Sequence, residues 1–275
     1  CYELQLTGTG EMEQPLFSSN DSPWFNYRKH ITSLTISEGI TSICDYAFWE
    51  HCSLSAVTLP DSVASIGISA FFNAYSLKTI TCGAGLKEIK ASAFQYLPSL
   101  ADIQFNNGLE KIGEFAFQGC EALKKLSLPG SLTSIPNCAF SELTSLTDLQ
   151  FSEGLKEIGT CAFQNCSALE RIVLPESLIS VKGNAFTNLT SLTSVQFGSG
   201  LQEIGGLAFS NCSSLTNISL PESLVTIEDS AFCFTGLTDI TLPKNVEHIT
   251  GNPFVNTPLK TLQVEAGSQH FFVRD

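Results

Sequence analysis

The sequence predicts an α/β solenoid, in which the chain winds into about ten stacked rungs of 23 residues each. Three observations predict this fold class. The dipeptide Ala-Phe recurs at a fixed spacing, apolar residues occupy the same positions in every copy, and the aromatic residues are 20 Phe against 2 Trp and 5 Tyr. A unit of this size cannot close a core alone, so stacked copies must share one.

The Ala-Phe dipeptide sets the length of the repeat. Its phenylalanines are spaced by 23 residues, and a Pro-Phe copy follows after 22: Phe48, Phe71, Phe94, Phe117, Phe140, Phe163, Phe186, Phe209, Phe232 and Phe254. The ten rungs therefore run from Ile31 to about residue 258. Positions within a rung are numbered here from Leu100 of rung 4, so that Phe117 occupies position 18.

Each part of a rung has its own signal. Leu100, Ile103 and Phe105, at positions 1, 4 and 6, have the spacing of a strand whose alternate residues face the core. Gly or Ser at position 9 predicts a corner, and apolar residues at positions 10 and 13 predict an extended return. The Ala-Phe pair predicts a short helical turn. The expected solenoid is right-handed and curved, with a parallel strand ladder on the concave face and the helical turns opposite.

The segment "LTNISLPESLVTIEDSAF" (residues 215–232), with its Leu-Pro step and Ala-Phe turn, resembles the BspA-like leucine-rich repeat family of cell-surface proteins. "LQLTGTGEM" (residues 4–12) and "SPWFNY" (residues 22–27) are similar to the usual start of that family. The resemblance implies a leucine-rich repeat fold and an extracellular place on a bacterial cell surface. It also implies an adhesive role, toward host matrix proteins or other cells.

The same comparison suggests how the chain is divided. We expect residues 1–30 to form an N-terminal cap, with Trp24 covering the first rung. Residues 31–258 are expected to form the solenoid of ten rungs, and residues 259–275 an incomplete eleventh rung. Family members usually continue from a segment like "FFVRD" (residues 271–275), and a solenoid normally has a polar cap at each end. We therefore expect the native protein to extend beyond Asp275.

Composition and motifs argue against several functions. The net charge of −13 disfavours nucleic acid and anionic membrane surfaces as partners. No run of about 18 apolar residues predicts a membrane span. No phosphate-binding loop, G-x-S-x-G or H-E-x-x-H motif occurs. His51 and Cys52 are adjacent, but neighbouring residues of an extended chain face opposite ways. We predict no catalytic residues, no cofactor, no metal site and no enzymatic activity.

Ten cysteines raise the question of disulfides. Cys120, Cys166 and Cys212 share position 21 but lie two rungs apart, roughly twice the strand spacing of 4.8 Å, which is too far for a bridge. Cys138 and Cys161 share position 16 on adjacent rungs, where a bridge is possible but two thiols are the favoured interpretation. Phe at position 6 accompanies Cys at position 21 in every second rung, so the true period is 46 residues. We predict that Cys166 is a buried small residue that compensates for the volume of Phe151.

The concave face carries the predicted binding site, because its exposed side chains come from positions 3 and 5 of successive rungs. Acid and base alternate at position 3, and Gln recurs at position 5. One interpretation is a polar groove for a protein or glycan ligand, including host extracellular matrix; the other is a solvated sheet neutralised by its own ion pairs. The candidate contacts are Asp102, Gln104, Lys125, Asp148, Gln150, Arg171 and Gln196.

The function expected from these observations is non-enzymatic recognition or adhesion through the solenoid surface. The alternative is a structural spacer that holds another domain away from the cell wall. Two lesser features remain. Trp49 and Phe72, on adjacent rungs, could form an exposed aromatic patch or pack under the cap. Asn recurs at position 20, which predicts a left-handed residue there, and three of these asparagines begin N-x-S/T sequons: Asn165, Asn188 and Asn211.

Overall fold

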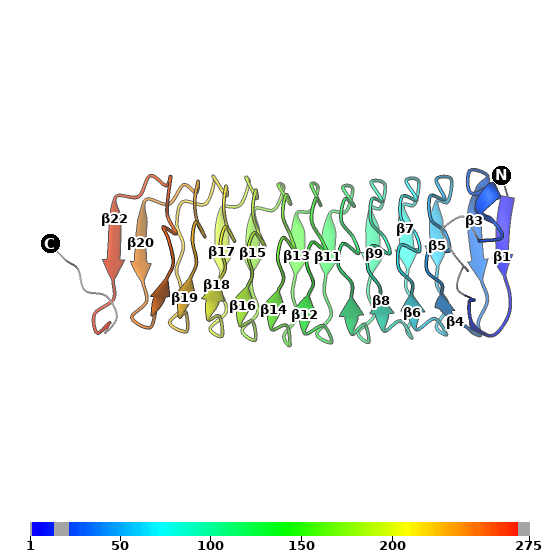
Figure 1. The fold of residues 1–275 in the computed structure, drawn as a ribbon, viewed down its shortest axis with the longest axis horizontal. Helices are drawn as coiled ribbons and strands as arrows, with labels where there is room; N and C mark the ends of the chain where they lie inside the picture. Colours follow the sequence, from blue (N-terminus) through cyan, green and yellow to red (C-terminus); the bar gives the residue numbers. More distant parts are fainter. Residues whose placement is uncertain (1, 14–21, 269–275) are drawn as a thin grey trace.

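The computed structural model describes residues 2–13 and 22–268 of the chain and contains a solenoid of stacked rungs. Figure 1 shows the rungs following one another in a nearly straight row, with the predicted curvature not visible in this view. Every strand pairing is parallel, and partners lie one rung apart, as in Lys125 opposite Asp148. The predicted strand ladder and the stack of about ten rungs are confirmed.

Most rungs contribute two short strands, so the solenoid has two ladders, while rung 9 (residues 215–236) contributes a strand to the second ladder alone. The first ladder holds β1 (Tyr2–Leu6), β3 (Ile31–Ile36), β5 (Ala56–Thr58), β7 (Thr79–Thr81), β9 (Asp102–Gln104), β11 (Lys125–Ser127), β13 (Asp148–Gln150), β15 (Arg171–Val173), β17 (Ser194–Gln196), β20 (Asp239–Leu242) and β22 (Thr261–Val264). The predicted eleventh rung begins at β22, and residues 269–275 lie outside the described residues.

The predicted extended return is the second ladder. It holds β2 (Gly10–Glu11), β4 (Ile40–Ile43), β6 (Ser65–Ile66), β8 (Glu88–Ile89), β10 (Lys111–Ile112), β12 (Ser134–Ile135), β14 (Glu157–Ile158), β16 (Ser180–Val181), β18 (Glu203–Ile204), β19 (Thr226–Ile227) and β21 (His248–Ile249). Both ladders bury the apolar residues of alternate positions, because successive side chains of a strand face opposite sides.

The predicted helical turns at Ala-Phe are wrong. Within the described residues the only helix is the 3-10 segment η2 (Phe25–Tyr27), which lies before the first rung. The Ala-Phe segments are turns flanked by left-handed residues at positions 16 and 20, for example Phe115 with φ 58° and Asn165 with φ 64°. Their N–H groups donate to the next rung, as in Phe117 N–H to the Ala139 carbonyl at 2.8 Å. The backbone therefore bonds between rungs and not along a helix.

Position 18 forms the centre of the core. The ten phenylalanines of this position stack ring on ring, as in Phe140 and Phe163, whose centroids are 5.5 Å apart with planes 11° apart. Nine of the rings are fully buried, and Phe254 is 8% exposed. Trp24 continues the stack at its N-terminal end, with its ring 5.7 Å from that of Phe48. The boundary of the cap at residue 30 stays a prediction.

The first ladder is interrupted with the predicted period of two rungs. Its hydrogen-bonded pairing stops after β9, β13 and β17. Each of these strands is followed directly by a phenylalanine at position 6, namely Phe105, Phe151 and Phe197. These rings pack edge-on against the Phe at position 18 of the same rung and stay half-buried, whereas Leu128 and Leu174 at position 6 are 4% and 2% exposed. The sequence period thus has a structural counterpart.

Candidate ligand-binding surfaces

The predicted contacts lie together on the first ladder, on strands β9, β11, β13, β15 and β17. We call the exposed side chains at positions 3 and 5 of this ladder the strand face. Asp102 and Gln104 lie on β9, and Lys125 lies on β11 of the next rung, at the same position 3 as Asp102. Six of the seven predicted contacts are exposed and Asp148 is half-buried. Ile103 and Leu126, at position 4 between the polar positions 3 and 5, point into the core. The two-residue strand period therefore places the polar side chains outward.

The expected ion pairs across the strand face do not form. Within the described residues, no ion pair within 4.0 Å joins Asp102, Lys125, Asp148 and Arg171. Asp148 instead accepts a hydrogen bond from Gln150 at 3.2 Å. Gln150 in turn accepts one from Ser127 at 3.3 Å. The second interpretation thus lacks its direct ion pairs, while the exposed polar side chains fit a solvated sheet as well as a binding surface.

The strand face differs from the corners in how its polar side chains are used. At the corners, the carboxylate of Glu153 accepts the backbone N–H groups of Glu176 and Ser177, both at 3.0 Å. Such contacts join one rung to the next and are part of the scaffold. Of the seven predicted contacts, five make no side-chain hydrogen bond or ion pair within the described part of the chain: Asp102, Gln104, Lys125, Arg171 and Gln196.

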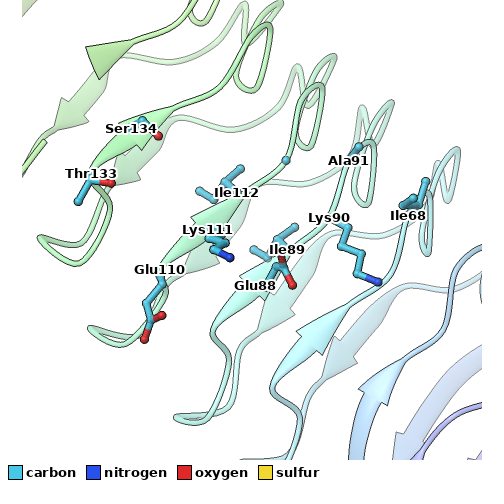
Figure 2. A pocket seen from close by; sticks show the side chains of 11 residues that line it. Ile68, Glu88, Ile89, Lys90, Ala91, Glu110, Lys111, Ile112, Thr133 and Ser134 are labelled. Carbon is cyan, nitrogen blue, oxygen red and sulfur yellow. The ribbon is translucent and has the colours of Figure 1, made fainter. Parts of the chain in front are cut away.

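A shallow hollow of about 510 Å³ lies on the second ladder. Figure 2 shows Glu88, Lys111 and Ser134 lining it from three successive strands, β8, β10 and β12. Pairing of the second ladder stops between β10 and β12. In the rungs on either side, the N–H of position 14 donates to the preceding rung, as in Gly113 to the Ile89 carbonyl at 2.7 Å. Rung 5 has Pro136 at this position, and proline has no N–H to donate.

Among the described residues every cysteine is a free thiol. Cys120, Cys166 and Cys212 are fully buried, and burial raises the pKa of the Cys166 thiol to about 12. Its Sγ–H donates to the Phe140 carbonyl at 3.3 Å. Cys138 and Cys161 are half-buried neighbours, and burial followed by the adjacent Cys161 thiol raises the pKa of Cys138 to about 11. The predicted burial of Cys166 is confirmed, and the disulfide between positions 16 is absent.

His51 is the one fully buried histidine in the described part of the chain. Its Nδ1 lies 3.2 Å from the Trp49 carbonyl oxygen, and its ring packs edge-on against Phe48. Nε2 has no hydrogen-bond partner. Burial lowers the pKa of His51 to about 4, and the positive charge of Arg28 adds to this shift. The side chain is thus held neutral beneath the cap, away from Cys52, whose Sγ–H donates to the Glu50 carbonyl at 3.0 Å.

Within residues 2–13 and 22–268, no three His, Cys, Asp or Glu side chains come together as metal ligands would. Across the same residues no helix has the length and apolar character needed to span a bilayer. The geometry provides two surfaces that a ligand could reach: the strand face, and the hollow on the second ladder from β8 to β12. The hollow was not predicted from the sequence, although a proline at a position of the second ladder indicates a break in strand pairing.

Parallel ladders, a stacked phenylalanine core and 23-residue rungs together define a leucine-rich repeat solenoid. The BspA type leucine rich repeat region, in six copies, matches residues 18–144 and 156–271. The chain belongs to this family. No curated protein matches the chain.

Solved structures of bacterial leucine-rich repeat proteins are similar to the chain. A leucine-rich repeat protein from Bacteroides ovatus is 22% identical with a TM-score of 0.75, over 95% of this chain and 69% of that one. The T. pallidum leucine rich repeat protein is 28% identical with a TM-score of 0.49, over 66% of this chain and 75% of that one. A leucine rich cell surface protein from Faecalibacterium prausnitzii is 23% identical with a TM-score of 0.43, over 96% and 90%. The similarity to the Bacteroides ovatus structure supports the leucine-rich repeat fold.

Proposed function

We propose that the chain is a non-enzymatic recognition module on the outside of a bacterial cell, which binds a protein or glycan ligand through the strand face. The observation that carries this proposal is that five of the predicted contacts, with charged or amide side chains, are exposed and have no partner in the scaffold. Polar groups that hold no rung in place are available to a ligand, and a rigid ladder presents them without a large ordering cost. Family membership supports the extracellular location.

The alternative is a spacer that positions another domain. A spacer needs only a rigid rod, so the identity of strand-face side chains would not matter to it. Positions 3 and 5 would then accept any polar residue suited to a strand, such as the Thr79 and Thr81 that the chain uses in rung 3. The two proposals differ in what replacing the strand face does to binding.

The test replaces Asp102, Gln104, Lys125, Arg171 and Gln196 together by Thr. Binding of parent and variant is measured on panels of host matrix proteins, bacterial cells and glycans. We expect retention to fall at least tenfold while the melting temperature changes little, because surface substitutions away from scaffold contacts are usually worth no more than about 0.5 kcal/mol. The control variant changes Lys156 and Gln202 to Thr, since both are exposed at position 11, outside the strand face and outside the hollow. Equal binding of parent and strand-face variant, or no binding by the parent, would favour the spacer.

A further inference from the structure

The tyrosines and tryptophans gather at one end of the solenoid. All five tyrosines and both tryptophans lie within the first 96 residues. Each tyrosine is exposed, from 36% for Tyr46 to 57% for Tyr2. In rungs 6 to 8 the corner positions 19 and 20 carry polar residues instead, such as Gln164 and Asn165. Because the core uses phenylalanine, the exposed tyrosines have no part in filling it.

Four aromatic rings form a row along the corner after position 18, on neighbouring rungs. Phe25 stacks on Trp49 with centroids 6.1 Å apart, and Trp49 stacks on Phe72 at 6.4 Å. Arg28 covers the other face of Phe25, with its guanidinium carbon 3.9 Å from the ring centroid. The faces of these three rings are therefore largely occupied by one another, and stacking leaves mainly their edges to solvent.

Tyr96, the fourth ring of the row, is oriented differently from the three stacked rings. Its ring meets Phe72 edge-on, at 5.7 Å and with planes 79° apart. It lies over the next rung at Gly119, where an added Cβ would stand 2.6 Å from Cδ1 and 3.1 Å from Cε1 of the tyrosine. Only a residue without a side chain leaves room for the ring there. Tyr96 thus lies against Gly119 with the Cδ1–Cε1 side of its ring, and the residue remains 38% exposed.

A row of hydrogen-bonded polar side chains starts beside Tyr96. The side-chain amide of Gln95 donates to Gln118 at 2.6 Å, and that of Gln118 donates to the Glu142 carboxylate at 3.0 Å. Each amide uses one of its N–H bonds in the row, and the second oxygen of Glu142 has no side-chain partner in the described part of the chain. The row is fixed in direction and offers acceptors and donors at rung spacing.

We propose that Tyr96 and the row of Gln95, Gln118 and Glu142 bind an uncharged sugar ring. The electron-rich face of an aromatic ring suits the C–H bonds on the apolar side of a pyranose. The carboxylate and amides suit its hydroxyl groups, with the bonds to Glu142 strengthened by its charge. A net charge of −13 and the carboxylate itself repel acidic sugars, so the ligand is a neutral glycan.

This inference concerns a surface apart from the strand face, and it rests on the proposed function only in taking the chain to be a binding module. The experiment measures binding of the parent to soluble glucan, xylan and mannan, with polygalacturonate as the acidic comparison. Isothermal titration calorimetry gives the affinity. Tryptophan emission gives a second readout, because Trp49 lies two rungs from Tyr96 and no tryptophan lies later in the chain.

Tyr96→Ala should weaken binding at least tenfold, and Tyr96→Phe should keep most of it because the ring remains. Gly119→Ala leaves every polar group in place, but its added Cβ displaces the ring of Tyr96. It should therefore also weaken binding tenfold. The matched control is Phe234→Ala, since Phe234 occupies the same position 20, has φ 56° against 57° for Tyr96, and is 54% exposed near the other end of the solenoid. This control should leave binding unchanged.

The proposal is overturned if the parent binds none of the neutral glycans, if it binds polygalacturonate equally well, or if Tyr96→Ala binds as the parent does. The variant with five strand-face replacements separates this inference from the proposed function. If it loses its panel ligand but keeps neutral glycan, both proposals stand with separate surfaces. If it loses neutral glycan while Tyr96→Ala keeps it, the sugar site at Tyr96 is wrong and the strand face is the binder.

Discussion

Trp24 stacks on Phe48 with centroids 5.7 Å apart and planes 18° apart, and its indole N–H donates to the Ala47 carbonyl at 2.6 Å. In later rungs the carbonyl of position 17 accepts the N–H of the preceding phenylalanine, as Ala70 accepts that of Phe48 at 2.7 Å. The first rung has no preceding rung, so Trp24 supplies both the missing ring and the missing donor.

Trp24→Phe keeps a ring on the stack but leaves the buried Ala47 carbonyl without its donor. We expect a loss of about 1 to 2 kcal/mol in the free energy of unfolding. Trp24→Ala removes the ring as well and should cost about 3 to 5 kcal/mol. Urea denaturation followed by circular dichroism measures both variants. Equal stability of Trp24→Phe and the parent would show that the hydrogen bond is not needed at this end.

His51 should make the stability of the cap end depend on pH. Its pKa is lowered to about 4 in the folded protein from an ordinary value near 6.5, so the unfolded chain binds the proton more readily. The stabilisation is complete above about pH 6.5 and is lost as the pH falls toward 4, up to about 3 kcal/mol. Arg28 and Glu50, which pair at 3.9 Å, are the charged groups beside it.

The measurement is the free energy of unfolding between pH 7 and 4 for the parent and for His51→Leu. Leucine occupies the same position 21 at Leu143 and Leu189, both fully buried. The variant should lose the part of the pH dependence that lies between 6.5 and 4 and keep the part that carboxylates contribute. If both proteins show the same slope over that interval, His51 does not titrate with folding.

The sequence predicted the rung because its period is set by core volume, which residue types report directly. Phe163 and Ile158 are buried where the pattern placed them. The turns were misjudged because position 16 is left-handed while holding Tyr46, Phe115 and Leu207, residue types that seldom adopt that conformation. Hydrogen bonds between rungs impose it, and no local preference reveals it.

The candidate surfaces, too, were predicted from the sequence only in part. Alternation along a strand predicted which side chains face outward on β9 to β17, and the exposure of Gln104 and Arg171 agrees with it. The ion pairs were wrongly expected, because a register of Lys125 opposite Asp148 does not fix the side-chain rotamers. Of the aromatic row, the sequence indicated only Trp49 and Phe72. Tyr96 was missed since it occupies position 20 and its seat depends on Gly119 in the next rung.

Cys166 tests the two-rung period of the core. In the folded protein a thiol reagent should label Cys138 and Cys161 before Cys166, which is fully buried with its pKa raised to about 12. Cys166→Leu should overpack the rung and cost about 1 to 3 kcal/mol. Adding Phe151→Leu should restore most of the lost stability, because rung 5 holds Leu at both position 6 and position 21.

Thermal unfolding of the single and double variants, with mass spectrometry of the labelled peptides, decides the matter. Phe151→Leu alone serves as the control, and it should lose stability through an unfilled volume. Rapid labelling of Cys166, or a double variant less stable than both singles, would contradict volume compensation between positions 6 and 21.

Pro136 should leave a weak point between rungs 4 and 5, because it cannot donate to the Ile112 carbonyl. The amide hydrogens of Thr133 and Ser134 lie at positions whose counterparts Lys87 and Glu88 donate to the Ala64 carbonyl at 2.9 and 3.1 Å. No such bond joins rung 5 to rung 4 among the described residues. These two amides should therefore exchange with solvent faster than those of Lys87 and Glu88.

Pro136→Gly restores the missing donor, since glycine occupies position 14 at Gly113 and Gly159 and bonds the preceding rung at both. We expect exchange of the Thr133 and Ser134 amides to slow at least tenfold, as measured by hydrogen-deuterium exchange of the folded protein. Pro129→Gly in the same rung is the matched control, because position 7 lies outside the second ladder and this change adds only backbone freedom. Unchanged exchange in Pro136→Gly would mean that the separation of β10 and β12 has a cause other than the absent N–H.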